Sequence, residues 1–319
     1  MRVLFAGLAS EGHTFPMLPL AIAARDIGHE VHFAAGEHVH PPLHRLGLNP
    51  FRPADSFYEI YAEDLEPDLA RLRPDLVVHG WGVPEVAVAA RRAGIPALWH
   101  GFGRMFPSGI GFERPDGGRH LDICPPSLQD EAFLATADRI ALRPVPFAEP
   151  GRFERPPAPF THLTLGTAFG TPEVLTAAIR GLAALGGHVV VATGRVRPQE
   201  LGSVPDHVTL HPWVPQAEVL PHAALVVHHG GSGTTLGALA AGVPQLVLPQ
   251  GADQFANAEA LVAAGAALRL LPGELSADAV TEQARKAAPC RDAARAIAAE
   301  IAAMPSPEEV ARERLPEVK

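Results

Sequence analysis

The stretch from His228 to Ala258, HHGGSGTTLGALAAGVPQLVLPQGADQFANA, decides the fold class of this chain. A short apolar run, 224–227, leads into it and predicts a buried strand. A glycine-rich turn follows, and residues 234–241 have helical character. A strand, a tight turn and a helix start leave backbone N–H groups unpaired, where the helix dipole favours negative charge. The stretch therefore predicts a phosphate or diphosphate site, to which side-chain donors are added by His229, Ser232, Thr234 and Thr235.

Composition limits the classes of protein to consider. The chain has 319 residues, 47% hydrophobic and 19% charged, which is enough for two globular domains. Its two cysteines, Cys124 and Cys290, cannot form a disulfide framework and favour a reducing compartment. The sequence shows neither a signal-peptide pattern nor an apolar run long enough to span a bilayer. We therefore expect a cytoplasmic protein without stable membrane insertion, and the net charge of −9 argues against a nucleic-acid partner.

Short apolar runs alternate with helical patterns along most of the chain. Repeated β–α–β units predict parallel sheets with helices on both faces, an α/β fold. We expect helices to begin near Phe15, at Pro84 and after Thr171, a good N-cap followed by Pro172. The predicted strands are Val3–Gly7, Val31–Gly36, Asp75–Gly80, Ala97–Gly101, Thr161–Gly166, His188–Gly194, Val208–Trp213, Ala224–His228 and Gln245–Pro249.

A proline-dense segment separates the two halves. Residues 143–160 read RPVPFAEPGRFERPPAPF, a composition that resists both helix and sheet. A new series of β–α units follows, so we interpret the segment as a linker rather than as a long surface loop. We expect a first domain over 1–145, a linker over 146–160 and a second domain over 161–304. Two facing parallel sheets would leave a cleft between the carboxyl ends of their strands.

Several side chains at predicted strand ends are candidates for binding. Thr167 would place a hydroxyl at the cleft, and Trp213 would either stack on a nucleobase or fill the core. Its position shortly before the phosphate-type turn favours stacking. Asp253 and Gln254 would bond sugar hydroxyls, although an aspartate there also serves as a helix N-cap.

In the first half, His13 lies in the loop after the first predicted strand. Histidine titrates near neutral pH and suits a general base. His38, His40 and His44 could be drawn as a metal cluster, but no carboxylate or cysteine completes a ligand set, so we expect no metal. The chain has no Walker A pattern, and its first glycine turn is not GxGxxG, which disfavours ATP-dependent phosphoryl transfer and a nicotinamide cofactor.

Together these motifs resemble the nucleotide-sugar glycosyltransferases of the GT-B fold, family 1, which include enzymes that decorate antibiotics. The likeness is strongest over 213–258, where Trp-x-Pro-Gln, His-x-Gly-x-Gly-Thr-Thr, Gly-Val-Pro and Asp-Gln-x-x-Asn-Ala occur in the family's order. The Gly-His-x-x-Pro motif that contains His13 also fits, whereas residues 50–75 and 102–145 match little. The resemblance implies two Rossmann-like domains and a C-terminal helix, 305–319, that crosses back to the first domain.

The resemblance also implies roles for individual residues. Trp213 would stack on the base, the backbone of Val214 would pair with it, and His13 would deprotonate the acceptor. The other implied donor-binding residues are Thr167, Gln216, His229, Gly231, Ser232, Gly233, Thr234, Asp253 and Gln254. The co-substrate would be a dTDP- or UDP-sugar, with no other cofactor and no metal. The sugar would be transferred with inversion to a small apolar acceptor. Trp81, Phe102 and Phe106 follow first-domain strands and would either line the acceptor side or belong to the core.

The chain departs from the family pattern in three places. Gly80 stands where an aspartate often orients the catalytic histidine, which leaves Asp75, Glu85 or His79 as substitutes. Gly237 stands where many members carry a glutamate that binds the ribose hydroxyls. We therefore expect a dTDP donor, which lacks the 2′-hydroxyl, to lose less binding affinity from this change than a UDP donor. The first domain is short, which suggests an open acceptor site or one completed by another chain, as in a homodimer.

Two other functions remain open on the sequence alone. The short first half and the missing aspartate would suit a nucleotide-sugar-binding protein that has lost catalysis and assists a partner enzyme. An epimerase acting on the donor sugar shares the fold and would need no acceptor.

Overall fold

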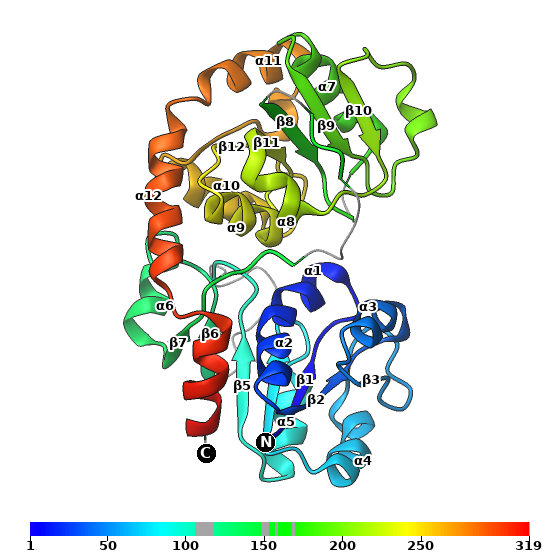
Figure 1. Ribbon diagram of the computed structural model, residues 1–319, viewed down its shortest axis with the longest axis vertical. Coiled ribbons are helices and arrows are strands. Elements are labelled where there is room, and N and C mark those ends of the chain that lie inside the picture. The colour runs from blue at the N-terminus through cyan, green and yellow to red at the C-terminus, as the bar shows by residue number, and fades with distance from the viewer. Residues whose placement is uncertain (106–117, 148–152, 157–158, 168–169, 319) are drawn as a thin grey trace. The chain divides into compact units, whose positions relative to one another are not determined.

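The computed structural model describes all residues except 106–117, 148–152, 157–158, 168–169 and 319 (Figure 1). The chain forms two compact units, which we call the first and the second unit. The first unit comprises Met1–Phe147 together with Ala303–Lys319, and the second comprises Ala148–Ala302. The C-terminal segment therefore belongs to the same unit as the N-terminus.

The described part of the first unit contains a seven-stranded parallel sheet in the order β3-β2-β1-β4-β5-β6-β7. The strand order reverses between β1 and β4, the point at which ligands bind in open α/β sheets. The strands are β1 (Arg2–Ala6), β2 (Glu30–Ala34), β3 (Pro50–Phe51), β4 (Leu76–Gly80), β5 (Ala97–His100), β6 (Arg119–Asp122) and β7 (Arg139–Ala141).

Helices cover both faces of this sheet. Alternate strand residues such as Leu4 and Val77 pack against Leu65 of α4 and Val86 of α5 in one buried cluster. The other face carries Phe5, whose ring stacks on Phe33 with 6.0 Å between the ring centroids. The helices are α1 (Glu11–Thr14), α2 (Leu18–Asp26), α3 (His40–Arg45), α4 (Ala62–Leu72), α5 (Glu85–Arg92), α6 (Glu131–Thr136) and α13 (Pro307–Glu309).

The second unit repeats this topology. Its six parallel strands have the order β10-β9-β8-β11-β12-β13, with the reversal between β8 and β11. The strands are β8 (Phe160–Thr164), β9 (His188–Ala192), β10 (Val208–His211), β11 (Ala223–His228), β12 (Gln245–Val247) and β13 (Ala267–Arg269).

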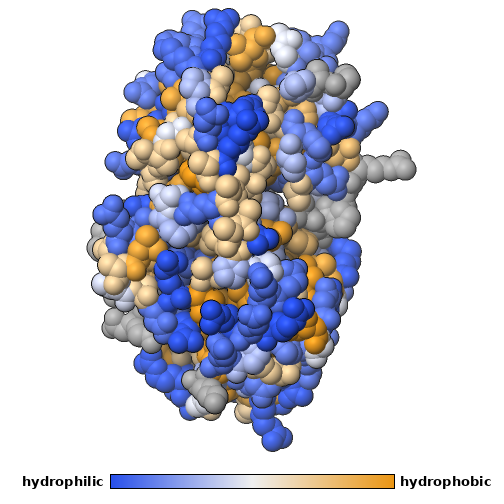
Figure 2. Space-filling model, turned by 60° about the vertical axis from the view of Figure 1, so that its left-hand side comes forward, coloured by the Kyte–Doolittle hydropathy of each residue, from blue (hydrophilic) through white to orange (hydrophobic). Residues whose placement is uncertain are grey.

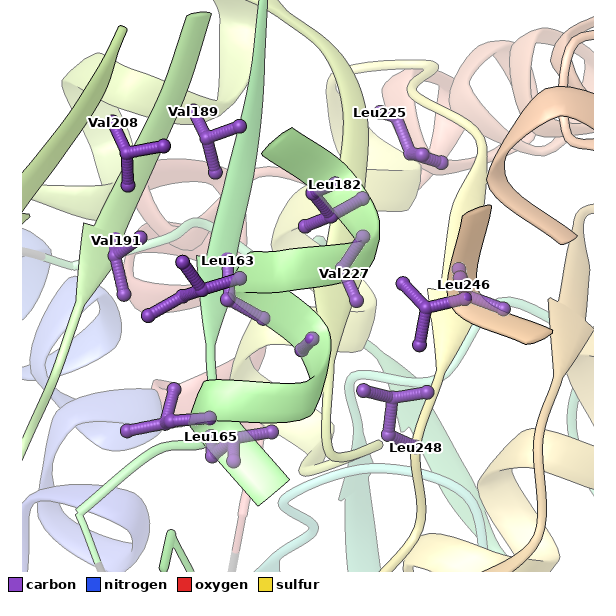
Figure 3. Packing of buried hydrophobic residues seen from close by; sticks show 14 of the residues in the cluster. Leu163, Leu165, Leu182, Val189, Val191, Val208, Leu225, Val227, Leu246 and Leu248 are labelled. Atoms are coloured by element: carbon purple, nitrogen blue, oxygen red, sulfur yellow. The ribbon is translucent and has the colours of Figure 1, made fainter. Parts of the chain in front are cut away.

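The core of the second unit lies on both faces of its sheet. On one face, strand residues such as Leu163 and Val227 pack against Leu182 of α7, as Figure 3 shows. On the other face, Val190 and Val226 pack against Ala238 of α9. The helices are α7 (Pro172–Ala183), α8 (Gln216–Val219), α9 (Ser232–Ala240), α10 (Gln254–Ala263), α11 (Ala277–Lys286) and α12 (Cys290–Ala303).

The predicted α/β class, with two Rossmann-like parallel sheets, is confirmed. All nine predicted strands occur, most of them one or two residues shorter than expected at the carboxyl end. The prediction missed β3, β6, β7 and β13. Two reasons are visible: β3 begins with a proline, and β6 reads RHLD, so neither presents the apolar run on which the prediction relied.

Two of the three predicted helix starts are correct. The Thr171 hydroxyl accepts a hydrogen bond from the Val174 amide at 3.4 Å, and α5 follows Pro84 directly. The start near Phe15 is wrong, because α1 already begins at Glu11. Pro16 then lies in a 3₁₀ turn, Phe15–Met17, before α2 continues the helical run.

The C-terminal segment begins with a capping box in which the Ser306 hydroxyl accepts from the Glu309 amide, and the Glu309 carboxylate accepts from the Ser306 amide. A π-helical turn, Val310–Arg314, follows and packs against α2 of the first unit. Over the described residues, no helix is both long and apolar enough to cross a membrane. On the face shown in Figure 2, hydrophilic and hydrophobic side chains are intermixed.

Candidate functional site

The loops at the carboxyl edge of the second unit's sheet are held close to one another. The Thr193 amide after β9 donates to the His211 carbonyl at 2.8 Å, and the Gly194 amide donates to the Pro212 carbonyl at 3.1 Å. A Cβ atom added to Gly194 would lie 2.3 Å from the Gly166 carbonyl oxygen, so the loops after β8 and β9 touch through their backbones. Parallel strands place these loops together at the edge where ligands bind.

The start of α9 presents unpaired backbone donors. Gly231 is the N-cap, and the N–H groups of 231–234 donate to no acceptor among the described residues. Thr235 is the first residue of the helix whose amide is paired, with the Gly231 carbonyl at 3.0 Å. Gly233 is exposed, and a Cβ added there would meet nothing within 4 Å. This arrangement leaves room for an anion to approach the amides.

His229 lies between two glycines. Added Cβ atoms at Gly231 and Gly166 would come within 2.5 Å of its Nε2 and 2.6 Å of its Cε1, respectively. Burial lowers the pKa of His229 to about 4, and the backbone of Thr164 offsets a smaller part of the shift. The imidazole is therefore neutral at pH 7, so it offers an N–H dipole rather than a full positive charge.

Asp253 lies beside the phosphate-type turn. Its Oδ2 accepts from the Ser232 hydroxyl at 3.1 Å and from the Asn257 side-chain amide at 2.8 Å. Asn257 also donates to the Gly230 carbonyl at 2.9 Å. Burial raises the pKa of the Asp253 carboxyl, and the bonds from Ser232 and Asn257 oppose that shift. These bonds join the turn at Gly230 and Ser232 to the start of α10 at Asp253 and Asn257, which lies more than twenty residues further along the chain.

Two predicted donor-binding glutamines have different surroundings. Gln216, at the start of α8, accepts a hydrogen bond from the Thr234 hydroxyl at 3.2 Å, which places the Trp-x-Pro-Gln motif against the phosphate-type turn. Gln254 is buried, and its Oε1 accepts from the amides of Gln250 and Gly251 at 2.8 and 3.1 Å. The side-chain oxygen of Gln254 therefore binds the backbone of the preceding loop. Its side-chain nitrogen is the group that remains to bind a sugar.

Trp213 and Val214 follow β10 at the same edge. The Trp213 side chain is 43% exposed, so it does not fill the core. Val214 is buried among Val190, Val219 and other apolar residues. Among the described residues, the backbone N–H and C=O of Val214 have no hydrogen-bond partner. An exposed indole next to an unpaired backbone donor and acceptor suits a planar base with a polar edge.

In the first unit, His13 lies inside α1 and not in a loop as predicted. Ser10 is the N-cap by position, and its carbonyl accepts hydrogen bonds from the amides of His13 and Thr14 at 3.2 and 2.8 Å. The His13 ring packs against Phe102, with 5.2 Å between ring centroids. Phe102 in turn lies 5.7 Å from the Trp81 ring. His13 thus stands at the reversal point of the first sheet, next to the aromatic residues that follow β4 and β5.

Burial lowers the pKa of His13 below its ordinary value of 6.5, and the Trp81 backbone carbonyl opposes the shift to a smaller extent. None of the described carboxylates contributes to this shift. Asp75 accepts from the Arg2 amide at 2.7 Å at the amino end of β1, the opposite edge of the sheet, so it cannot orient His13. Apart from burial, the Trp81 main-chain carbonyl is thus the only influence on the pKa of His13 among the described residues.

The three predicted acceptor residues differ in placement. Trp81 is 7% exposed and belongs to a buried cluster with Trp99 and Phe133, whereas Phe102 is partly buried at the edge of that cluster. Phe106 lies outside the described residues.

Sequence reasoning missed three exposed aromatic residues, Phe57, Tyr58 and Tyr61. The Ala9 amide donates to the Tyr58 carbonyl at 3.3 Å, which fastens their loop to the one before α1. Three aromatic residues within five positions of a chain with 6% aromatic content were the signal available.

Two of the histidines considered for a metal, His40 and His44, lie close to each other in α3. His40 Nε2 bonds the Ala35 carbonyl at 2.9 Å, and its ring lies 6.1 Å from that of His44. In the part of the chain that the structure describes, no group of three His, Cys, Asp or Glu side chains is placed to hold a metal ion.

Comparison with known proteins agrees with this geometry. Residues 176–316 match the model of the erythromycin biosynthesis protein CIII-like C-terminal domain. Elloramycin glycosyltransferase of Streptomyces olivaceus is 33% identical over an alignment of 376 positions, gaps included, which covers 98% of this chain and 96% of that protein. L-demethylnoviosyl transferase of Streptomyces niveus is 33% identical over 85% of each chain.

A solved structure extends the likeness to three dimensions. Spinosyn rhamnosyltransferase superposes with a TM-score of 0.83 at 25% identity, covering 98% of this chain and 99% of that one. That protein has also been solved in complex with thymidine diphosphate. With the two Rossmann-like sheets and the near full-length relatives, these findings show that the chain belongs to the family 1 natural-product glycosyltransferases of the GT-B fold.

Proposed function

We propose that this glycosyltransferase moves a sugar from a dTDP- or UDP-sugar to a small apolar acceptor, with inversion at the anomeric carbon and without a metal. The observation that carries the proposal is the row of unpaired amides over 231–234, next to the neutral imidazole of His229. A nucleoside diphosphate satisfies such donors, because its charge is stabilised by the helix dipole and by several N–H groups together.

The neighbouring residues account for the rest of the donor. The base stacks on Trp213 and bonds the backbone of Val214. Asp253 has one carboxylate oxygen engaged by Ser232 and Asn257, which leaves Oδ1 to accept from a sugar hydroxyl. Thr167 is exposed in the turn that follows β8, the strand beside β11, where its hydroxyl reaches the transferred sugar or the phosphate.

The reaction needs one proton acceptor and one charge-stabilising group. His13, neutral at pH 7 because burial lowers its pKa, takes the proton from the acceptor hydroxyl. The oxygen forms a bond to the anomeric carbon as the bond between that carbon and the diphosphate oxygen breaks. The electron pair of the broken bond stays on the diphosphate, where the α9 amides and His229 stabilise the growing charge.

The chain also favours one nucleotide over the other. Gly237, within α9, has no side chain to bond a ribose 2′-hydroxyl. A thymidine nucleotide lacks that hydroxyl, so it loses no contact there, and a structural relative has been solved with thymidine diphosphate. We therefore expect dTDP to bind at least as tightly as UDP in calorimetry, and clearly tighter binding of UDP would reject this preference.

The acceptor is expected to contact aromatic side chains of the first unit. Phe102 packs against His13, and Phe57, Tyr58 and Tyr61 present exposed rings on a loop tied to the α1 loop. These rings bind a flat apolar molecule by stacking and burial.

The deciding experiment is a transfer assay with a panel of dTDP- and UDP-sugars and hydrophobic phenols or polyketides, comparing wild type with His13→Ala. The expected result is that His13→Ala abolishes transfer while the Kd for the nucleoside diphosphate stays within about twofold. A variant that retains transfer would remove His13 from the mechanism. Binding without transfer in the wild type would instead favour the auxiliary protein, and sugar isomerisation without an acceptor would favour the epimerase.

A further inference from the structure

A buried polar pair lies directly beneath the phosphate-type turn. His228 ends β11 and Gln245 begins β12, and both are fully buried. None of the binding roles proposed above uses either residue. Burying a polar side chain costs free energy of folding unless the side chain forms hydrogen bonds. The hydrogen-bond partners of this pair therefore indicate its role.

The hydrogen bonds fix the protonation state of His228. Its Nδ1 accepts from the Gly230 amide at 3.1 Å, so Nδ1 carries no proton. Its Nε2 then carries the proton and donates to Gln245 Oε1 at 2.7 Å, while the Gln245 amide nitrogen faces the Thr235 carbonyl of α9 at 3.5 Å. Burial, followed by the nearby His229, lowers the pKa of His228 to about 3, so the ring stays neutral at any working pH.

Gly230 is the residue on which this pair acts. Its φ of +95° lies in the left-handed region that favours glycine, and an added Cβ would lie 2.9 Å from Val247 Cγ1. Its amide is held by His228 and its carbonyl by the Asn257 side chain. The peptide groups on both sides of Gly230 are thus oriented by side chains, immediately before the unpaired amides of 231–234.

We propose that His228 is a positioning residue for the diphosphate site, holding the Gly230 turn so that the amides at the start of α9 face the donor. The proposal rests on the proposed function, because it assumes that these amides bind a diphosphate. The hydrogen bond from the Gly230 amide to His228 Nδ1 has the connectivity of an Asx turn, in which the side-chain oxygen of an Asn or Asp accepts from the amide two residues ahead. An asparagine at 228 could therefore replace Nδ1, whereas the longer glutamine would reach only the Nε2 position.

His162 provides a matched control in the adjacent strand β8. It is also fully buried, and burial lowers its pKa to about 4. Its Nδ1 bonds the Val190 carbonyl at 3.1 Å, and among the described residues it makes no hydrogen bond to the turn at Gly230. His162 is near enough to His228 to lower its pKa slightly, but truncating His162 removes none of the hydrogen bonds that hold Gly230.

The test compares the binding of a nucleoside and its diphosphate. Calorimetry gives the Kd of thymidine and of dTDP, and of uridine and UDP, for the wild type, His228→Ala, His228→Asn, His228→Gln and His162→Ala. The ratio of the nucleoside Kd to the diphosphate Kd isolates the contribution of the phosphates. We expect this ratio to fall at least about tenfold, or about 1.4 kcal/mol, in His228→Ala and His228→Gln. It should remain close to wild type in His228→Asn and His162→Ala.

Two results would overturn the positioning role: an unchanged ratio in His228→Ala or His228→Gln, or an equal loss in His162→Ala. If His228→Ala does not fold, the contrast between the asparagine and glutamine variants decides the question alone. A wild-type ratio near one would instead refute the donor site itself, so the two failures are distinguishable.

Discussion

Replacing Gly231 with alanine tests the fit between His229 and the turn that carries the unpaired amides. The added Cβ would lie 2.5 Å from His229 Nε2, whereas ordinary contact begins at 3.4 Å, so the ring must move by about 0.9 Å. The ring also packs against Gly166, where an added Cβ would lie 2.6 Å from Cε1, which limits the room into which it can move. A shift of this size breaks a hydrogen bond to a phosphate, because N–H···O bonds are made over a narrow range of distance.

The expected cost follows from the kind of bond lost. A hydrogen bond to a charged group is worth about 1.5–3 kcal/mol, which corresponds to a rise in Kd of roughly 10- to 150-fold. Calorimetric titration with dTDP and UDP measures this change. Gly187→Ala is the matched control, because a Cβ there meets nothing within 4 Å and the residue lies in a distant turn of the same unit. A Gly231→Ala protein that binds nucleoside diphosphate as tightly as Gly187→Ala would refute the assigned role of His229.

Three further predictions concern the base, the acid limb of activity and stability. Trp213→Ala should weaken thymidine or uridine binding by about 1–3 kcal/mol through lost stacking, and an unchanged Kd in calorimetry would contradict the role of the indole. Because His13 must be neutral to accept a proton and burial lowers its pKa below 6.5, kcat/KM should be level at pH 7 and fall only in more acid solution, as a pH–rate profile would show. Buried histidines with depressed pKa values contribute stability that is present above pH 6.5 and lost as the pH falls towards 4, each by up to about 1.4 kcal/mol per pH unit. Burial raises the pKa of Asp122 to about 6, so this carboxyl gains stability as the pH falls and offsets the loss from roughly one histidine. Urea unfolding should therefore show a lower free energy of unfolding at pH 5 than at pH 7. Equal values at the two pH values would contradict the burial of these histidines. The histidines concerned are His79, His100, His162, His228 and His229.

Much of the fold could be predicted because it depends on local patterns. The apolar runs within β1, β4 and β11 are continuous and are followed by glycine or polar residues, as is typical of central parallel strands. The start of α7 was readable from Thr171 and Pro172, since capping depends on adjacent residues. Strand β6 was missed because its residues, RHLD, are polar and are accommodated by tertiary contacts such as the bond from Gln129 to Asp122 at 2.9 Å.

The candidate site divides in the same way. The phosphate-type turn was recognisable, because its glycines and the helix that follows are contiguous in sequence. The partners of its side chains were not: the bonds from Ser232 to Asp253 and from Thr234 to Gln216 join residues 21 and 18 positions apart. The burial of Trp81 and the exposure of Phe57 were equally hidden, because exposure depends on which elements pack over a side chain and not on the side chain itself.

A crystal structure of the protein with dTDP or UDP tests the central claim most directly. The account predicts that phosphate oxygens lie within about 3.2 Å of the backbone nitrogens of 231–234, with the base stacked on Trp213. A nucleotide bound elsewhere on the second unit, with those amides facing only solvent, would contradict it.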